Sequence, residues 1–212
     1  MIFKKVTEYF ESIMPNPQSE LHYSNPFELL VAVILSAQCT DKRVNMITPE
    51  LFKTFPTAEK MAKAKIDEIY NLIKSCSYPN NKSHHLSNMA KMLHEKYNGQ
   101  IPTDINEMQN LPGVGRKTAN VVAAVAFNQQ TMPVDTHVFR VAARLGLTTN
   151  SSTPLETEKQ LVKGFPKEKL SKAHHWLILH GRYTCTARNP KCSQCGLSNI
   201  CKYHKDNTTH LL

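Results

Sequence analysis

The chain has 212 residues, enough for one large domain or two smaller domains that each bury a core. Lys and Arg number 26 against 17 Asp and Glu, which gives a net charge of +9. This charge favours a polyanionic partner, either nucleic acid or an anionic membrane, although a basic protein without such a partner would have the same composition. The longest apolar run, Leu29 to Leu35, is too short to span a bilayer and the first residues lack a signal-peptide core, so we expect a cytoplasmic protein.

Helical periodicity dominates the chain, and no long alternating strand pattern occurs, so we expect an all-α protein. The first clear helix start is Asn25-Pro26-Phe27-Glu28, with Asn25 as N-cap and Glu28 at the position of a capping box. The helix that follows is apolar on all sides and should be buried. Thr40-Asp41 then predicts the cap of the next helix.

A later helix should place four apolar side chains on one face and end at Asn98-Gly99. These side chains are Leu86, Met89, Ala90 and Leu93. The polar stretch Thr148 to Pro154 is a predicted loop and a candidate domain boundary. His174, His175 and His180 fall on a predicted helix, where packing and hydrogen bonding are favoured over a metal site.

The segment Leu111-Pro112-Gly113-Val114-Gly115-Arg116-Lys117 connects two predicted helices, the first of which begins near Asp104. Its glycines permit backbone angles closed to other residues and the close approach of another backbone. The start of the second helix offers free N–H groups, which suit a phosphate. An ordinary helix–helix turn has the same pattern, but Arg116 and Lys117 add cations that favour a grip on a DNA backbone.

Lys117 and Asp135 are the candidate chemical groups. Lys117 falls in the first turn of the second helix, where the helix dipole and the neighbouring Arg116 disfavour an ammonium and so favour a nucleophilic amine. Asp135 or Thr136 is a predicted N-cap of the helix that follows Pro133. A carboxylate at a helix start is held ionised, so Asp135 could stabilise a sugar cation, although it could also be a cap and nothing more.

The C-terminal region contains Cys185, Cys192, Cys195 and Cys201 with the spacing C-x6-C-x2-C-x5-C. Cysteines in a reducing compartment are metal ligands or buried thiols more often than disulfides, and four this close together can hold one metal centre. Both zinc and a [4Fe–4S] cluster accept four cysteines, and the spacing alone slightly favours iron–sulfur. Cys39 and Cys76 lie far away and are interpreted as buried or incidental thiols.

Four motifs in this order resemble the endonuclease III family of the helix-hairpin-helix glycosylase superfamily. They are LPGVGRKTA, VDTHVFR, HHWLILHGRYTC and the four-cysteine loop, and the match covers nearly the whole chain. The resemblance implies a [4Fe–4S] cluster on the four cysteines. It also implies that Lys117 is the Schiff-base lysine, that Asp135 is the catalytic aspartate, and that Gly113, Val114 and Gly115 form the hairpin that holds phosphate.

The resemblance further assigns DNA contacts. Gln38 matches the glutamine that fills the gap left by a flipped nucleotide. Tyr78 falls in the loop from which the family inserts a second wedge, although Ser77 stands where a glycine is common. The other expected DNA contacts are Arg116, His137, Arg140, Arg188 and Lys191.

The family fold implies two helical lobes with DNA bound between them. Residues 22–132 would form one lobe, with the helix-hairpin-helix at about 104–124, and residues 1–21 with 133–212 the other, with the cluster loop at 185–201. The implied protein is a monomeric, nucleoid-associated repair enzyme acting on double-stranded DNA with damaged pyrimidines or abasic sites, and not at a membrane.

The implied activity is that of a bifunctional DNA glycosylase and AP lyase, which excises oxidised pyrimidines and cleaves the strand 3′ to the abasic site by β-elimination. The alternatives are an adenine-mismatch glycosylase of the same superfamily, which lacks the lysine, and a non-catalytic DNA-binding module with structural zinc, which needs neither Lys117 nor Asp135.

Overall fold

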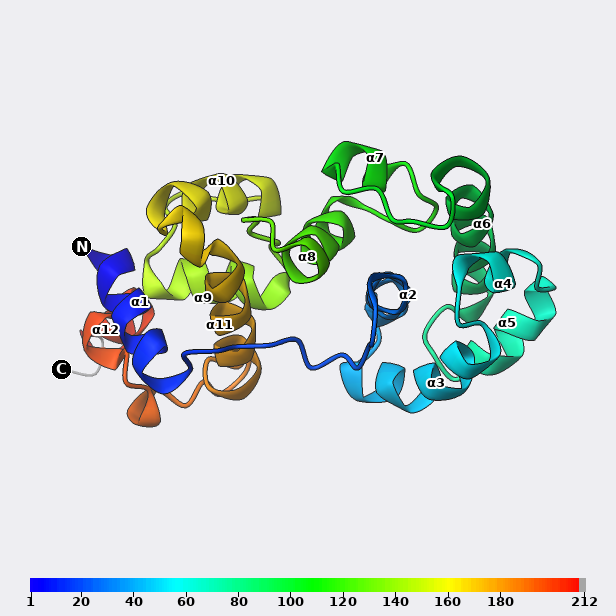
Figure 1. The fold of residues 1–212 in the computed structure, drawn as a ribbon. Helices are drawn as coiled ribbons and strands as arrows, with labels where there is room; N and C mark the ends of the chain where they lie inside the picture. The colour runs from blue at the N-terminus through cyan, green and yellow to red at the C-terminus, as the bar shows by residue number, and fades with distance from the viewer. Residues whose placement is uncertain (210–212) are drawn as a thin grey trace. The chain divides into compact units, whose positions relative to one another are not determined.

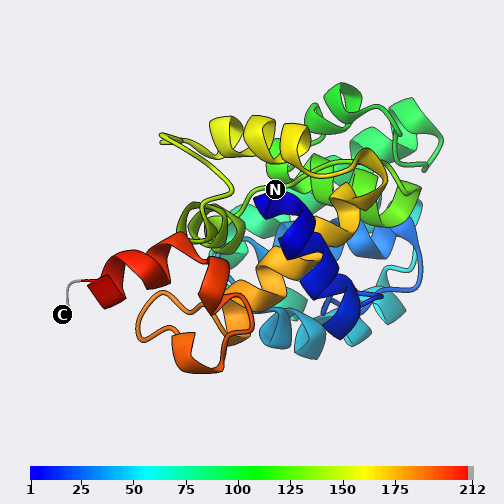
Figure 2. The same ribbon diagram turned by 90° about the vertical axis from the view of Figure 1, so that its left-hand side faces the viewer.

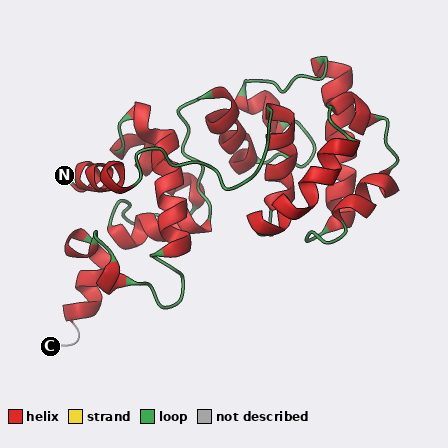
Figure 3. Ribbon diagram, turned by 60° about the horizontal axis from the view of Figure 1, so that its bottom comes forward, coloured by secondary structure: helices red, strands yellow, loops and turns green. Residues whose placement is uncertain are grey.

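The computed structural model describes residues 1–209, and within them every regular element is helical (Figure 3). The expected all-α class is therefore confirmed. The chain divides into two compact units: residues 19–128 form one, and residues 1–18 join the chain from Gln129 onward to form the other. None of the described helices combines the length and the apolar character that crossing a membrane requires.

The 19–128 unit is built around one apolar helix. Its helices are α2 (Pro26–Ser36), α3 (Asp41–Thr54), α4 (Ala58–Ala62), α5 (Ile66–Ile73), α6 (Pro79–Tyr97), α7 (Ile105–Gln109) and α8 (Arg116–Phe127). Helix α2 packs against α3 and α8, while α4 and α5 pack against α6 (Figure 1). Every residue from Leu29 to Leu35 is buried, as the uninterrupted apolar sequence of α2 predicts.

Side chains fix where α2 and α3 begin. Asn25 Oδ1 accepts the N–H of Glu28 at 3.0 Å, and Thr40 Oγ1 accepts the N–H of Arg43 at 3.2 Å, so both predicted N-caps are confirmed. The predicted capping box is wrong in its second half, because Glu28 Oε2 accepts the N–H of Ser24 at 2.6 Å instead of that of Asn25. The extended backbone of Asn25 (φ −152°, ψ 168°) brings the Ser24 amide to this carboxylate.

Helix α6 follows its predicted pattern. Leu86, Met89, Ala90 and Leu93 are all buried, and the helix ends on Asn98, whose φ of 51° is a left-handed C-cap. Its first residue is Pro79, and the residue before it, Tyr78, also has a left-handed backbone conformation. The start of α6 therefore lies directly beside the loop that carries Tyr78.

The other unit joins the N-terminal helix to the C-terminal part of the chain. Its helices are α1 (Ile2–Ile13), α9 (Thr136–Leu145), α10 (Pro154–Gly164), α11 (Leu170–Tyr183) and α12 (Lys202–Thr209), with short 3-10 helices η1 (Lys167–Lys169), η2 (Cys192–Gln194) and η3 (Ser198–Ile200). Helix α1 lies against α11 (Figure 2), where the rings of Phe10 and Trp176 stack with centroids 5.8 Å apart. Trp176 Nε1 also donates to Met14 O at 2.7 Å, which fastens the end of α1.

The chain passes between the units at residues 18–19 and 128–129, a few positions before the expected 21–22 and 132–133. The polar loop before α10 is not a boundary, because both of its sides belong to the same unit. That loop is fastened locally: the Thr149 N–H donates to Gln160 Oε1 at 2.8 Å, and Thr153 caps α10. Residues 210–212, the end of the expected second lobe, lie outside the described residues.

Candidate functional site

The turn between α7 and α8 forms at the predicted place. Asp104 caps α7, and its Oδ1 accepts two backbone N–H groups at 2.8 and 2.9 Å. Gly113 has a φ of +79°, and a Cβ at this position would lie 2.9 Å from the Cβ of His85 on α6. Both the backbone angle and the nearness of α6 therefore require glycine at position 113.

Gly115 needs neither the special backbone angle nor the close approach of another backbone that the sequence predicts for the glycines of this turn. Its φ of −86° and ψ of 176° are open to any residue, so the backbone angle does not require glycine. Gly115 is the N-cap of α8, and apart from Gly115 itself and its two chain neighbours no heavy atom lies within 4 Å of where its Cβ would be. The first turn of α8 thus has neither a capping side chain nor an obstruction beside it, which is the arrangement that an anion needs.

The residues that flank Gly115 divide between core and surface. Val114 is only 5% exposed and packs in the core of the 19–128 unit, so it can reach DNA only through its backbone. Arg116 and Lys117 lie in the first turn of α8 and are exposed. Lys117 is thus accessible at the start of a helix whose opposite side is buried.

Asp135 is the N-cap of α9. Its Oδ1 accepts the N–H of Val138 at 2.8 Å, and the side chain is half-buried. The structure therefore selects Asp135, not Thr136, from the two predicted caps.

His137 and Arg140 lie on the same helix, but their side chains bind within the protein. Arg140 Nε donates to Cys185 O at 3.1 Å, and its Nη2 donates to Gly181 O at 2.8 Å. The same Nη2 lies 3.2 Å from His137 Nδ1. These bonds join α9 to the end of α11 and to the start of the cysteine loop.

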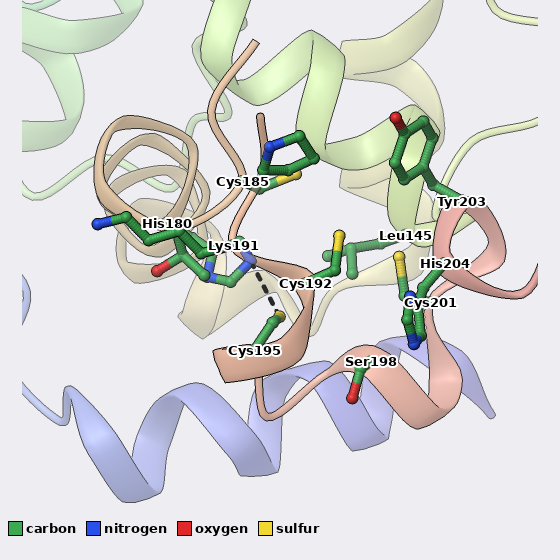
Figure 4. A pocket seen from close by; sticks show the side chains of 12 residues that line it. Leu145, His180, Cys185, Lys191, Cys192, Cys195, Ser198, Cys201, Tyr203 and His204 are labelled. Carbon is green, nitrogen blue, oxygen red and sulfur yellow. Dashed lines mark hydrogen bonds between the residues drawn. The ribbon is translucent and has the colours of Figure 1, made fainter. Parts of the chain in front are cut away.

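The four predicted cysteines come together. Cys185 follows α11, Cys192 begins η2, Cys195 follows η2 and Cys201 precedes α12. All four line one pocket that is partly open to solvent (Figure 4). This places the four thiols around a shared space, as the spacing predicts.

The chemistry of this pocket fits an iron–sulfur cluster. Four cysteine thiols line this one space, and a [4Fe–4S] cluster takes four cysteine thiolates as its ligands. Burial raises the pKa of the Cys195 and Cys201 thiols, and the charges of the neighbouring cysteines raise it further. Iron must therefore displace protons from these thiols as it binds.

Arg144, which is not among the predicted site residues, supports the cysteine loop. Its guanidinium donates to Thr186 O at 2.7 Å and to Ala187 O at 3.0 Å, and lies 3.5 Å from Cys185 Sγ. It also lies 4.5 Å from the centre of the Tyr203 ring. An arginine in the last turn of a helix normally serves the helix dipole, so no local pattern in the sequence marks Arg144 for this role.

The basic residues of the cysteine loop are at the surface. Arg188 and Lys191 are both exposed, and Lys191 lies at the edge of the pocket (Figure 4).

His180 lines the same pocket, with Nε2 3.7 Å from Cys195 Sγ. Burial lowers the pKa of His180 to about 4, so its ring is neutral at physiological pH. His174, in contrast, is buried, and its Nδ1 lies 2.8 Å from Pro133 O, as expected of a histidine that serves packing and hydrogen bonding.

Gln38 and Tyr78 share an uncommon backbone conformation. Among the described residues, six other than glycine have positive φ; four are asparagine, which tolerates this region, and the remaining two are Gln38 and Tyr78, each at 54°. For such residues the left-handed conformation costs about 1–3 kcal/mol, and strain of this kind concentrates at functional sites. Both side chains are exposed, Tyr78 by 61%. Because the positive φ falls on Tyr78, the serine at position 77 causes no strain.

Comparison with known proteins defines the class. A family model described as "HhH-GPD superfamily base excision DNA repair protein" matches residues 31–167. A second, described as the iron–sulfur binding domain of endonuclease III, matches residues 185–201. The fold, the hairpin and the cysteine loop are therefore those of a helix-hairpin-helix base excision DNA repair protein with an iron–sulfur cluster.

Relatives specify the family. Endonuclease III of Rickettsia felis is 47% identical over 96% of this chain and 95% of its own, and that of Escherichia coli is 43% identical over 89% of each. A solved structure described as a trapped endonuclease III–DNA covalent intermediate is 42% identical, with a TM-score of 0.92 over 97% of this chain and 96% of that chain. The chain belongs to the endonuclease III family. It is a base excision repair enzyme, a DNA glycosylase and AP lyase, and carries a [4Fe–4S] cluster.

Proposed function

We propose that this enzyme excises oxidised pyrimidines from duplex DNA and then cuts the strand 3′ to the resulting abasic site by β-elimination. The observation that carries the proposal is the exposed amine of Lys117 at the start of α8, beside the unobstructed Gly115. A phosphate held at the helix start would bring the neighbouring sugar within reach of this amine.

The proposed chemistry at Lys117 is covalent. The neutral amine attacks C1′, and the damaged base leaves with the electrons of the glycosidic bond. The nitrogen then loses a proton and the C1′–O4′ bond breaks, so that the sugar ring opens, O4′ takes up a proton and a C1′=N imine forms. The imine makes a C2′ proton acidic, and when a base removes this proton the C3′–O bond breaks and the 3′ phosphate leaves. The 42% identical structure described as a trapped endonuclease III–DNA covalent intermediate supports a covalent route.

Asp135 has a second role in the proposal. Its Oδ1 is engaged by the N–H of Val138, which fixes the carboxylate and leaves Oδ2 for chemistry. An ionised carboxylate stabilises positive charge on the sugar as the base departs, and it can accept a proton during the reaction.

The proposed DNA contacts fall into three groups. Gly113, Val114 and Gly115 bind a phosphate through their backbone, with Arg116 beside them. Gln38 and Tyr78 enter the stack when the damaged nucleotide is extruded. Arg188 and Lys191 bind phosphates from the cysteine loop, and the cluster, when bound, cross-links this loop at four points.

His137 and Arg140 enter the proposal at the joint between α9 and the cysteine loop, because Arg140 donates to Gly181 O and Cys185 O. His137 is half-buried, and we propose that its ring approaches DNA beside Asp135. One copy of the chain supplies every residue in this scheme, so we propose that the enzyme acts as a monomer, on chromosomal DNA at the nucleoid.

Duplexes that each carry one defined lesion test this proposal. The enzyme should release oxidised pyrimidines and nick the strand, and it should leave an undamaged duplex and an adenine mismatch intact. Asp135→Asn is a matched variant because asparagine caps a helix as well as aspartate does, so the fold is kept. We expect Asp135→Asn to bind DNA normally and to release the base about 10²- to 10⁴-fold more slowly.

Excision of adenine from a mismatch with no nick would contradict the proposal and indicate a mismatch glycosylase. Full activity of Asp135→Asn would remove Asp135 from the mechanism while leaving the substrate class intact.

A further inference from the structure

A lysine is buried in the 19–128 unit, close to the loops of Gln38 and Tyr78. Lys82 lies in the first turns of α6 and is only 5% exposed. Lysine is almost never fully buried unless its ammonium is paired, because removing that charge from water is costly. The partners of Lys82 therefore indicate what it does.

The ammonium of Lys82 binds the end of α2. It donates to Leu35 O at 2.8 Å and to Ala37 O at 2.7 Å. These carbonyls lie where α2 runs out of intrahelical donors, at the negative end of its dipole. Lys82 thus satisfies the C-terminus of α2 from another helix.

The same ammonium also binds the loop before α6. It lies 3.3 Å from Cys76 Sγ and 3.2 Å from Ser77 Oγ. Burial raises the pKa of the Cys76 thiol, which stays protonated and donates to Leu35 O at 3.3 Å. The ammonium has three N–H donors. Its four acceptors, which are two carbonyl oxygens at the end of α2, the Cys76 sulfur and the Ser77 hydroxyl, engage all three.

Ser77 completes a link between the two loops. Its hydroxyl accepts from Lys82 and lies 2.7 Å from Gln38 O, to which it donates. The Lys82 ammonium therefore binds Ala37, which precedes Gln38, and Ser77, which precedes Tyr78. Gln38 and Tyr78 each have a φ of 54°. An exposed residue does not keep a left-handed backbone unless the surrounding structure holds it there.

We infer that Lys82 is a positioning residue for nucleotide extrusion, which holds the Gln38 loop and the Tyr78 loop in the one arrangement that can open the DNA stack. The inference rests on the proposed roles of Gln38 and Tyr78. It also explains the presence of a buried cation that lies outside the Lys117 and Asp135 chemistry.

The inference separates two activities. Excision from a duplex requires a base pair to open and the gap to be filled, whereas cleavage at an abasic site in single-stranded DNA requires neither. Loss of the Lys82 ammonium should therefore slow the first reaction and spare the second. A lysine that only stabilised the fold would affect both reactions equally.

The test compares Lys82→Met with Lys91→Met, which removes an exposed lysine from the same helix. Single-turnover rates are measured on a duplex with one oxidised pyrimidine and on a single strand with one abasic site. We expect Lys82→Met to lose at least about tenfold on the duplex and less than about twofold on the single strand, which is the size of effect that one charge-assisted hydrogen bond produces. Lys91→Met should match the parent on both.

Ser77→Ala keeps the inference testable if Lys82→Met does not fold, because it removes only the hydroxyl that joins Lys82 to Gln38 O. We expect the same selective loss on the duplex, at smaller size. Equal losses on both substrates, or no loss on the duplex, would overturn the inference. Gln38→Ala separates this failure from that of the proposed function: if Gln38→Ala leaves duplex excision unchanged, the assignment of Gln38 is wrong, and if only Gln38→Ala slows it, Lys82 is not the positioning residue.

Discussion

Gly113 and Gly115 stand two positions apart, yet the structure requires glycine at only one of them for folding. Gly113 has a left-handed backbone and lies against His85 on α6, whereas Gly115 has an ordinary extended backbone with open space beside it. The first glycine therefore serves the fold of the hairpin. The second leaves room for a ligand at the start of α8.

Substitutions at these glycines should separate stability from binding. Gly113→Ala should lower the free energy of unfolding by about 1–3 kcal/mol, since it adds both backbone strain and a contact with His85. Gly115→Ser should keep or raise the melting temperature, because serine is a good N-cap, but its hydroxyl would occupy the N–H groups meant for a phosphate. We expect its affinity for duplex DNA to fall about tenfold.

Thermal unfolding measures the stability of both variants, and a titration with duplex DNA measures their affinity. Normal DNA affinity in Gly115→Ser would show that the phosphate binds elsewhere.

Residue positions could be predicted where the local sequence alone determines them. The sequence places Lys117 in a first turn and Asp135 at a helix start, and the structure has both there. Lys82 and Arg144 escaped prediction because their roles depend on carbonyl groups of segments far along the chain. No local pattern marks a side chain that crosses to another element.

At the scale of elements, the cysteine loop is the part least able to support itself. Between Cys185 and Cys201 only short 3-10 helices form, and Leu197 is the one buried apolar side chain among residues 186–200 of this described loop. Arg144 and Arg140 fasten the loop at its beginning. A cluster held by its four cysteines would add further order to this loop.

Cys192→Ser should therefore lose iron and loosen the loop. We expect lower iron and sulfide content, a lower melting temperature and weaker DNA binding, because Arg188 and Lys191 would no longer be held in place. Cys39→Ser is the matched control, since it removes a thiol from the other unit and should keep the cluster. Full iron content together with full activity in Cys192→Ser would refute the role given to this cysteine.

Helices with strong end signals and a clear apolar face could be predicted from the sequence. Helices α2 and α6 are examples, since one has a capping asparagine and the other an asparagine C-cap. The short helices α4 and α5 have too few residues for a periodic pattern to be distinctive. The loop before α10 appeared to be a boundary because a polar sequence does not reveal that Gln160 fastens it.

At the scale of the whole molecule, the joining of residues 1–18 to the C-terminal part of the chain could not be derived from composition. It depends on Phe10 and Trp176, which pair across most of the sequence. Only the resemblance to a known family indicated a split of this kind. The net charge of +9, in contrast, is a direct sequence property that predicts a polyanionic partner.

Binding to undamaged duplex DNA should depend steeply on salt. Each phosphate neutralised by a lysine or arginine contributes about −0.9 to the slope of log affinity against log salt. Arg188→Ala should reduce the size of this slope by about one unit, because Arg188 is an exposed cation of the proposed interface. Titrations at several salt concentrations measure the slope, and an affinity that hardly responds to salt would argue against a phosphate-binding surface.

The central claim is that Lys117 is the nucleophile, and borohydride trapping on a lesion-containing duplex tests it most directly. Borohydride reduces an imine to a stable amine and should leave the enzyme covalently attached to the DNA. We expect Lys117→Ala to form no adduct and make no nick while binding DNA nearly as well as the parent, and Arg116→Ala, which removes the adjacent cation but keeps the amine, to form the adduct. An undiminished adduct in Lys117→Ala would mean that another amine attacks the sugar and would contradict the account.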